Sequence, residues 1–316
     1  MSTVAYEIVD VFTDRPYAGN PLAVVHDAEG LAPDQMHTLA REFNLAETVF
    51  VLPPVAPGAT YRVRIFTTET ELPFAGHPSV GAAVTLMRRG GFPPGDVVQE
   101  CGAGLLPISV TPAGSATLTG GTPTLGDPLD PVPLLETVGL SAEDHAGGEL
   151  AASRSAGCGL PWTFLPVRRE ALARAALNPV AAKAYGVSGL TVFSWSESAG
   201  PGSATPGSAG PGSAAPASGG SAGEAHARVF VPGEAVWEDP ATGSAALGLG
   251  VWLVAAGWLP GEGVSSYRVH QGHEIKRPSL LECTVTASGG AATSATVTGH
   301  VVPIAKGEIA IPPFVG

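Results

Sequence analysis

Two short turns of small residues place polar side chains at the start of apolar segments. The first turn spans Glu71–Gly81 and the second spans Glu238–Ala246. The residues of chemical interest are Gly76 and His77 in the first turn and Asp239, Gly243 and Ser244 in the second. A helix that begins at such a turn presents free backbone N–H groups and positive potential, which suit a bound carboxylate. Two such turns, one in each half of the chain, predict two similar lobes that face each other across one site.

His77 and Asp239 each have two interpretations. The positive potential of a helix start disfavours an imidazolium ion, so we expect His77 to act as a neutral hydrogen-bond partner of a substrate. The alternative is a histidine that only caps its helix. Asp, Thr and Ser are ordinary N-capping residues, so Asp239 and Ser244 could also be caps. The pairing of the two turns favours a site.

Glu47 is a candidate general acid or base. It stands between Asn44-Leu45-Ala46 and the apolar segment Thr48–Leu52. Burial of a carboxyl group next to a strand favours its neutral form and suits proton transfer near neutral pH. The alternative is a glutamate in solvent at the edge of a strand.

Other motifs carry weaker indications. His270 and His273 are three residues apart, but no third ligand stands at a convincing spacing, so we expect no metal. Gly102-Ala103-Gly104 and Gly248-Leu249-Gly250 lack the strand, turn, helix and downstream acid of a dinucleotide site. Arg277 is expected to form a structural ion pair.

The composition limits the possible partners and the compartment. The 316 residues are 44% hydrophobic and 14% charged, with a formal charge of −12, which argues against nucleic acid and anionic membranes. The start of the sequence lacks a secretory signal pattern. The three cysteines, Cys101, Cys158 and Cys283, are odd in number and far apart, as in a reduced cytoplasmic protein.

The periodicity of apolar residues predicts alternating strands and a few helices. The expected strands are Tyr6–Phe12, Leu22–Val25, Thr48–Leu52, Tyr61–Phe66, Val187–Trp195, Arg228–Val231, and three or four between Val264 and Ile311. The expected helices are Pro33–Phe43, one from Val80 to Arg88, one or two within Ala171–Ala184, and the apolar Leu247–Ala256. Residues 198–223, composed only of Ser, Ala, Gly, Pro and Thr, are expected to be a disordered insertion.

The two helices that follow the turns are too apolar for a surface position. We therefore expect an α/β (α+β) fold of two similar lobes, each a curled mixed β-sheet around a central helix. The expected N-terminal lobe is 1–127, completed by a strand around 300–316. The expected C-terminal lobe is 128–299.

Several motifs occur together in a characteristic order. They are Asp10-Val11-Phe12, Gly19-Asn20-Pro21, Asn44–Thr48, Arg64–Thr67, Glu71–Pro78, Glu238–Ala245, and Gln271-Gly272 with Arg277-Pro278-Ser279. With them the chain resembles the PhzF-like (phenazine-biosynthesis isomerase) family from about Tyr6 to the C-terminus.

The resemblance implies a diaminopimelate-epimerase-like fold, no cofactor, and a homodimer. It also implies isomerisation of a small unsaturated cyclic acid such as trans-2,3-dihydro-3-hydroxyanthranilate, in secondary-metabolite biosynthesis. By the same resemblance, Glu47 matches the acid/base glutamate of the family. His77, Asp239 and Ser244 match residues that hold the substrate, and the amides near Gly76 and Gly243 favour its anionic end.

The chain departs from the pattern at Ala46, Thr68 and Lys276. Related racemases use one cysteine on each turn, and neither turn here contains one, which favours a single carboxyl acid/base. Two alternatives stay open: an amino-acid epimerase or racemase without catalytic cysteines, and a catalytically silent binding protein on the same scaffold.

Overall fold

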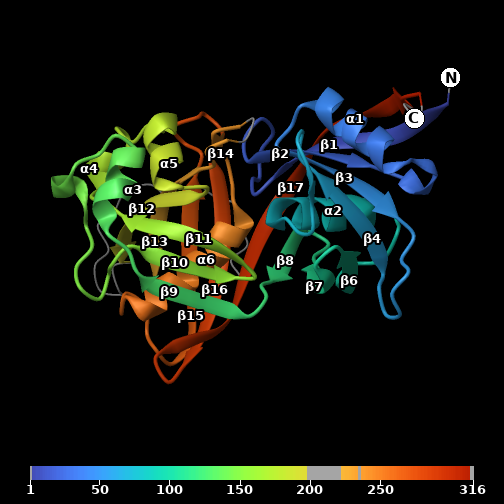
Figure 1. The fold of residues 1–316 in the computed structure, drawn as a ribbon. Coiled ribbons are helices and arrows are strands. Elements are labelled where there is room, and N and C mark those ends of the chain that lie inside the picture. Colours follow the sequence, from blue (N-terminus) through green and yellow to red (C-terminus); the bar gives the residue numbers. More distant parts are fainter. Residues whose placement is uncertain (1, 198–221, 234–235, 314–316) are drawn as a thin grey trace.

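The computed structural model describes residues 2–197, 222–233 and 236–313. The chain forms two lobes side by side, joined by the long strand β17 (Ala291–Ala310) that runs from one into the other (Figure 1). No helix within these described ranges is long and apolar enough to cross a membrane.

The N-terminal lobe is a curled mixed sheet closed around one helix. Its strands are β1 (Thr3–Val11), β2 (Asn20–Val25), β3 (Glu47–Leu52), β4 (Tyr61–Phe66), β5 (Glu71–Leu72), β6 (Gly95–Cys101), β7 (Gly104–Val110) and β8 (Ser115–Thr119). Its helices are η1 (Ala28–Gly30), α1 (Pro33–Phe43) and the central α2 (Gly76–Arg88). β2 pairs in parallel with β3 and β4 with β6, whereas the other pairings are antiparallel. Every residue of α2 from Gly76 to Thr85 is buried.

The C-terminal lobe repeats this plan. Its strands are β9 (Pro123–Pro128), β10 (Arg154–Cys158), β11 (Leu160–Pro166), β12 (Leu190–Glu197), β13 (Gly223–Phe230), β14 (Glu238–Asp239), β15 (Gly263–Gln271) and β16 (Ser279–Ser288). Its helices are α3 (Pro131–Thr137), η2 (Ala142–Asp144), α4 (Arg169–Leu172), α5 (Pro179–Tyr185) and the central α6 (Gly243–Ala255). The parallel pairs are β11 with β12 and β13 with β15, and the short β14 precedes α6 as β5 precedes α2.

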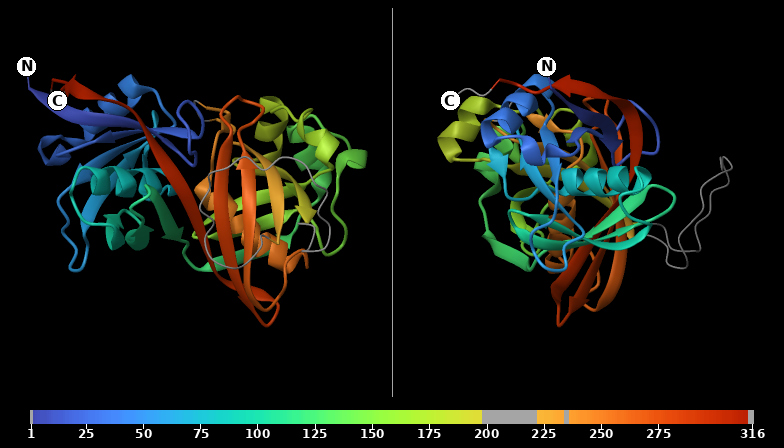
Figure 2. Two further views of the ribbon diagram at one scale, coloured as in Figure 1. Left: turned by 180° about the vertical axis from the view of Figure 1, so that it is seen from behind. Right: turned by 90° about the vertical axis from the view of Figure 1, so that its right-hand side faces the viewer.

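β17 connects the two sheets through backbone hydrogen bonds. It pairs with β16 over 291–298, with β8 over 296–300, and with β1 over 301–310. The pairs β17–β1 and β17–β8 close the ring of strands around α2. β1 and the last part of β17 lie together at the outer end of this lobe (Figure 2).

Helix α6 is buried on all sides, as its apolar sequence predicts. Every residue from Gly243 to Val254 is buried. Its glycines allow the surrounding strands to approach: a Cβ on Gly248 would lie 2.8 Å from the Ala156 carbonyl oxygen, and one on Gly250 would lie 2.5 Å from the Tyr267 hydroxyl. That hydroxyl donates a hydrogen bond of 2.7 Å to the Ala246 carbonyl, so the sheet and the helix are fixed to each other.

The helix Pro33–Phe43 and the strand Tyr61–Phe66 have the predicted bounds. The two central helices begin earlier than predicted, at Gly76 and Gly243, because their first turns of Gly, Pro, Ser and Ala resemble loops in sequence. Pro78 fits in the first turn because an N–H there has no intrahelical partner.

Most of the predicted disordered insertion, residues 198–221, lies outside the described residues. The predicted end at residue 223 is wrong, because Gly223 is the first residue of β13. The Ala222 N–H also donates to the Ser266 carbonyl at 2.8 Å, so regular pairing has begun at this point.

Gly272, directly after β15, is required by the backbone. Its φ is +77°, and a Cβ there would lie 2.3 Å from the Arg277 carbonyl oxygen and 2.7 Å from that of Pro240. The Arg277 N–H donates to the Gly272 carbonyl at 2.8 Å and closes the loop. Gly272 therefore allows the loop 272–277 to pack against the turn that contains Pro240.

We predict that Gly272→Ala lowers the free energy of unfolding by about 3 kcal/mol, from left-handed strain together with overpacking. Gly289→Ala is the matched control, because Gly289 has a φ of +62° and open space around it. It should cost only about 1 kcal/mol. Urea unfolding of both variants measures the difference, and equal losses would contradict the packing explanation.

Candidate active site

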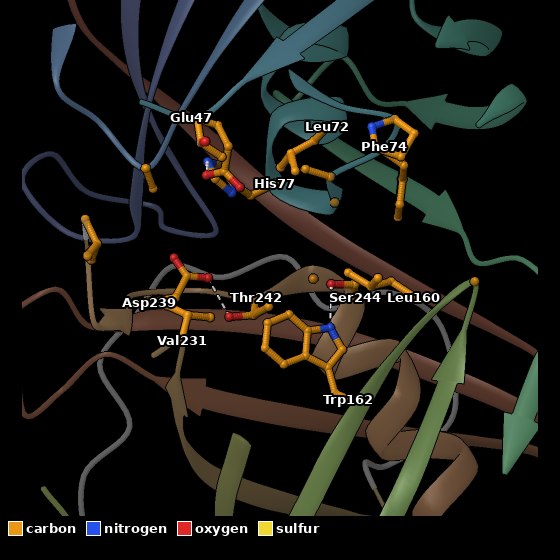
Figure 3. Close-up of a pocket in the computed structure, with 18 of the residues that line it drawn as sticks. Glu47, Leu72, Phe74, His77, Leu160, Trp162, Val231, Asp239, Thr242 and Ser244 are labelled. Carbon is orange, nitrogen blue, oxygen red and sulfur yellow. Dashed lines mark hydrogen bonds and ion pairs between the residues drawn. The ribbon is translucent and has the colours of Figure 1, made fainter. Parts of the chain in front are cut away.

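A cavity of about 510 Å³ lies between the lobes and receives side chains from both. Figure 3 shows Glu47 and His77 on the side of the N-terminal lobe, opposite Asp239, Thr242 and Ser244 on the other lobe. The larger apolar side chains of its wall are Leu45, Leu72, Phe74, Leu160, Trp162, Val231 and Val236. The cavity thus combines a polar cluster with an extensive apolar surface.

The first turns of α2 and α6 meet at the cavity. A Cβ on Gly76 would lie 3.2 Å from both the Gly243 Cα and the Ser244 amide nitrogen. These glycines therefore allow the two helix N-termini to approach, and both line the cavity. Backbone N–H groups and two helix dipoles give this part of the wall an affinity for anions. The described lining residues include neither Lys nor Arg, so these helix starts supply its positive potential.

His77 is buried in the first turn of α2, with 4% of its side chain exposed. The Asn20 side-chain amide donates to His77 Nδ1 at 3.3 Å, which places the ring proton on Nε2 in the neutral form. Nε2 lies 3.6 Å from Glu47 Oε2. Burial lowers the His77 pKa to about 3, so the ring is neutral near pH 7. Desolvation causes this shift, whereas the sequence suggested the helix potential.

Glu47 is the first residue of β3, where it pairs with Leu22 of β2. Only 17% of its side chain is exposed, so the interpretation as a solvated edge glutamate is wrong. Its carboxylate faces His77 and lines the cavity (Figure 3). A carboxyl group in this position can exchange a proton with a bound molecule.

Asp239 is held by hydrogen bonds from both lobes. Its Oδ1 accepts from Asn20 Nδ2 at 2.8 Å, and its Oδ2 accepts from the Thr242 hydroxyl at 2.5 Å. Burial raises the Asp239 pKa to about 6, while the Thr242 and Asn20 hydrogen bonds oppose that rise. Asn20 also donates to the Ala241 carbonyl at 3.0 Å. Asp239 is therefore a fixed acceptor whose pKa lies above its usual value.

Gln271 holds the turn that carries Asp239 and Thr242. Its side-chain NH₂ donates to the Asp239 carbonyl at 2.7 Å and to the Thr242 hydroxyl at 3.0 Å. Its side-chain oxygen accepts from the Thr242 N–H at 3.2 Å. One amide thus satisfies three groups at the start of α6, and it directly precedes the constrained Gly272.

Arg277 fixes the loop before Asn20, and the prediction of a structural ion pair is confirmed. Its guanidinium donates to Asp10 Oδ1 at 2.5 Å and to the carbonyls of Ala18 and Gly19 at 3.0 Å each. Asp10 also accepts from the Tyr17 N–H at 2.7 Å. This network fixes the backbone from which the Asn20 side chain extends into the site.

Ser244 lies in the first turn of α6, and its Oγ accepts a hydrogen bond of 2.9 Å from the Trp162 indole N–H. Trp162 belongs to β11 and lines the same cavity (Figure 3). The hydroxyl of Ser244 is thus oriented by a residue far away in the sequence.

The other reactive side chains lie outside the cavity. His270 and His273 are close to His226, Glu224 and Glu274 and contribute nothing to the cavity lining. Within 2–197, 222–233 and 236–313, no group of His, Cys, Asp and Glu side chains is arranged to hold a metal. None of the three cysteines lines the cavity, and burial raises the pKa of Cys158 to about 11. The cavity therefore offers no pair of thiols for racemisation.

Three residues that position the site could not be assigned a role from the sequence. Asn20 and Gln271 stand in motifs that mark their positions, but the motifs do not indicate which groups they contact. Trp162 carries no sequence signal, because its place at the cavity depends on how β11 pairs with its neighbours.

Comparison with known proteins relates this chain to a family. A family described as "Phenazine biosynthesis-like protein" matches residues 9–307. A protein from Mesorhizobium japonicum, named an uncharacterized isomerase, is 36% identical over 98% of this chain and 100% of its own length. The trans-2,3-dihydro-3-hydroxyanthranilate isomerase of Pseudomonas fluorescens is 30% identical over 97% of this chain and 99% of its own.

A solved structure supports the fold. The crystal structure of a PhzF-family phenazine biosynthesis protein from Bacillus anthracis superposes with a TM-score of 0.79 at 23% identity, covering 98% of this chain and 100% of that one. The predicted diaminopimelate-epimerase-like fold is confirmed. The chain belongs to the phenazine biosynthesis-like, or PhzF, family, and it is an isomerase.

Proposed function

We propose that this isomerase moves a proton within a small unsaturated cyclic carboxylic acid similar to trans-2,3-dihydro-3-hydroxyanthranilate, with Glu47 as general acid and base. The observation that carries the proposal is the position of Glu47. Its carboxylate faces the neutral His77 in an interlobe cavity where two helix N-termini meet. The name of the Pseudomonas fluorescens relative supports the choice of substrate class.

The polar groups of the cavity suit the parts of such a substrate. The amides at Gly76 and Gly243 and the Ser244 hydroxyl receive its carboxylate. Asp239, an acceptor held by Asn20 and Thr242, receives a hydrogen bond from an amino or hydroxyl substituent. The apolar wall covers the ring and excludes water, which strengthens these polar contacts.

The reaction requires one carboxyl group that first removes a proton and then returns it. The Glu47 carboxylate removes a proton from an allylic carbon of the substrate ring, and the electron pair of that C–H bond moves into the conjugated system. Glu47 becomes neutral while negative charge spreads over the substrate, close to the helix starts and the His77 Nε2–H that stabilise it. Glu47 then returns the proton to another carbon of the same system, and the double bonds end in shifted positions.

A racemase that uses two carboxylates is the second candidate, because Glu47 and Asp239 lie on opposite lobes and line one cavity. The hydrogen bonds to both Asp239 oxygens favour a fixed acceptor over a base that exchanges protons. Chiral analysis of amino acids incubated with the protein discriminates the two, because only the racemase inverts an α-carbon.

We predict that Glu47→Gln folds normally and lowers kcat by about 10²-fold or more, because the amide cannot accept the proton. Turnover of trans-2,3-dihydro-3-hydroxyanthranilate is followed by its ultraviolet spectrum. The matched control is Glu42→Gln, which changes an exposed glutamate of the same lobe and should keep full activity. Full activity in the Glu47 variant would remove it from the mechanism.

We predict that kcat/KM falls as the pH drops below about 6, the pKa to which burial raises Asp239. The sign follows from the role of the group: above this pH the carboxylate accepts a hydrogen bond from the substrate, and below it the added proton removes that acceptor. Asp239→Asn should lower kcat/KM and move the acid limb away from pH 6, leaving the limb that protonation of the base Glu47 produces. An acid limb that stays at the same pH in Asp239→Asn would assign it to another group.

A further inference from the structure

Trp162 contacts the proposed site through a single defined hydrogen bond. Its indole N–H donates to Ser244 Oγ at 2.9 Å. An indole nitrogen is only a donor, so in this contact the serine oxygen is the acceptor and keeps its own proton. Ser244 is buried, with 5% exposed, and it lines the cavity.

Ser79, a serine in the first turns of the other central helix, is arranged differently. Its hydroxyl donates to the Ala75 carbonyl at 2.8 Å and accepts from Gln99 Nε2 at 2.8 Å. Its proton is therefore used within the helix. The only hydrogen bond of Ser244 Oγ within the described residues is the one from Trp162, so its proton is available to a molecule in the cavity.

The place of the indole depends on a glycine. A Cβ on Gly189 would lie 2.9 Å from Trp162 Cζ3 and 3.0 Å from Cε3, closer than side chains pack. Gly189 directly precedes β12, which pairs in parallel with β11. The absence of a side chain at this position allows the indole to lie where its N–H reaches Ser244.

We propose that Trp162 is a positioning residue that orients the Ser244 hydroxyl as a hydrogen-bond donor to the substrate carboxylate. The proposal rests on the function proposed above, which supplies the anionic ligand. A hydroxyl that accepts one hydrogen bond donates a stronger one, and a carboxylate is the acceptor that gains most from it. The indole ring at the same time forms part of the apolar wall.

The test is a double-mutant cycle with Trp162→Phe and Ser244→Ala. The phenylalanine keeps an aromatic wall but removes the indole N–H. We expect each single variant to raise KM about tenfold, the effect of losing a hydrogen bond to a charged group, with a smaller change in kcat. The KM of the double variant should be no higher than that of Ser244→Ala, because Trp162 acts through Ser244.

Two further variants separate positioning from structure. Gly189→Ala should displace the indole and raise KM in the same direction as Trp162→Phe. Trp195→Phe is the matched control: Trp195 packs against the core, and its indole nitrogen has no hydrogen-bond partner in the described residues, so KM should not change. The proposal would be overturned if the increases in KM of the two single variants multiplied in the double variant, or if Trp162→Phe left KM unchanged.

Calorimetric titration of the same variants with benzoate, a planar carboxylate that cannot react, separates this inference from the proposed function. If the wild-type protein isomerises no dienoic acid but the Trp162 and Ser244 variants show coupled losses of benzoate affinity, the role of Trp162 is supported and the proposed function is refuted. Normal turnover by the wild type, with independent effects of the two substitutions on KM and on benzoate binding, would refute the role of Trp162 alone.

Discussion

The side-chain amide of Asn20 connects the two lobes at the point where the chemistry is proposed. It is fully buried at the start of β2, and its two N–H hydrogens are shared among three acceptors: Asp239 Oδ1, the Ala241 carbonyl and His77 Nδ1. These contacts set the tautomer of the histidine and the orientation of the carboxylate together. The Arg277 network holds the backbone before Asn20. The surrounding polar contacts therefore support the placement of this one amide.

Burial explains the electrostatics of the site. It lowers the His77 pKa to about 3 and raises that of Asp239 to about 6, so it favours the uncharged form of each group. With neither Lys nor Arg among the described lining residues, the positive potential comes from the starts of α2 and α6. Fixed dipoles of this kind stabilise a negative charge that develops during a reaction without a mobile counterion. The close contact of Gly76 with Gly243 is what brings both helix starts to one place.

Local sequence signals predicted the elements that have their own boundary residues. Pro33 and Asn44 mark the ends of α1, where Asn44 adopts a left-handed conformation with φ of 51°. The starts of α2 and α6 could not be predicted in this way, because a buried first turn of small residues has no amphipathic period. Glu47, His77, Asp239 and Ser244 were found through paired turns and family motifs. The hydrogen bond from Asn20 to Asp239 joins residues 219 positions apart, and the position of the Trp162 indole depends on Gly189. Neither contact therefore leaves a local pattern in the sequence.

In the proposed mechanism one carboxyl group, Glu47, both removes and returns the proton. The stereochemical course of the reaction in D₂O tests it most directly. The substrate carbon that loses its single hydrogen has a known configuration, so the departure face is known, and NMR of the product gives the face that receives protium or deuterium. We expect the added hydrogen on the same face of the ring, as protium carried over by Glu47 or as deuterium where its carboxyl group has first exchanged with solvent, since one group serves both steps. Deuterium on the opposite face would require a second acid and would contradict this mechanism.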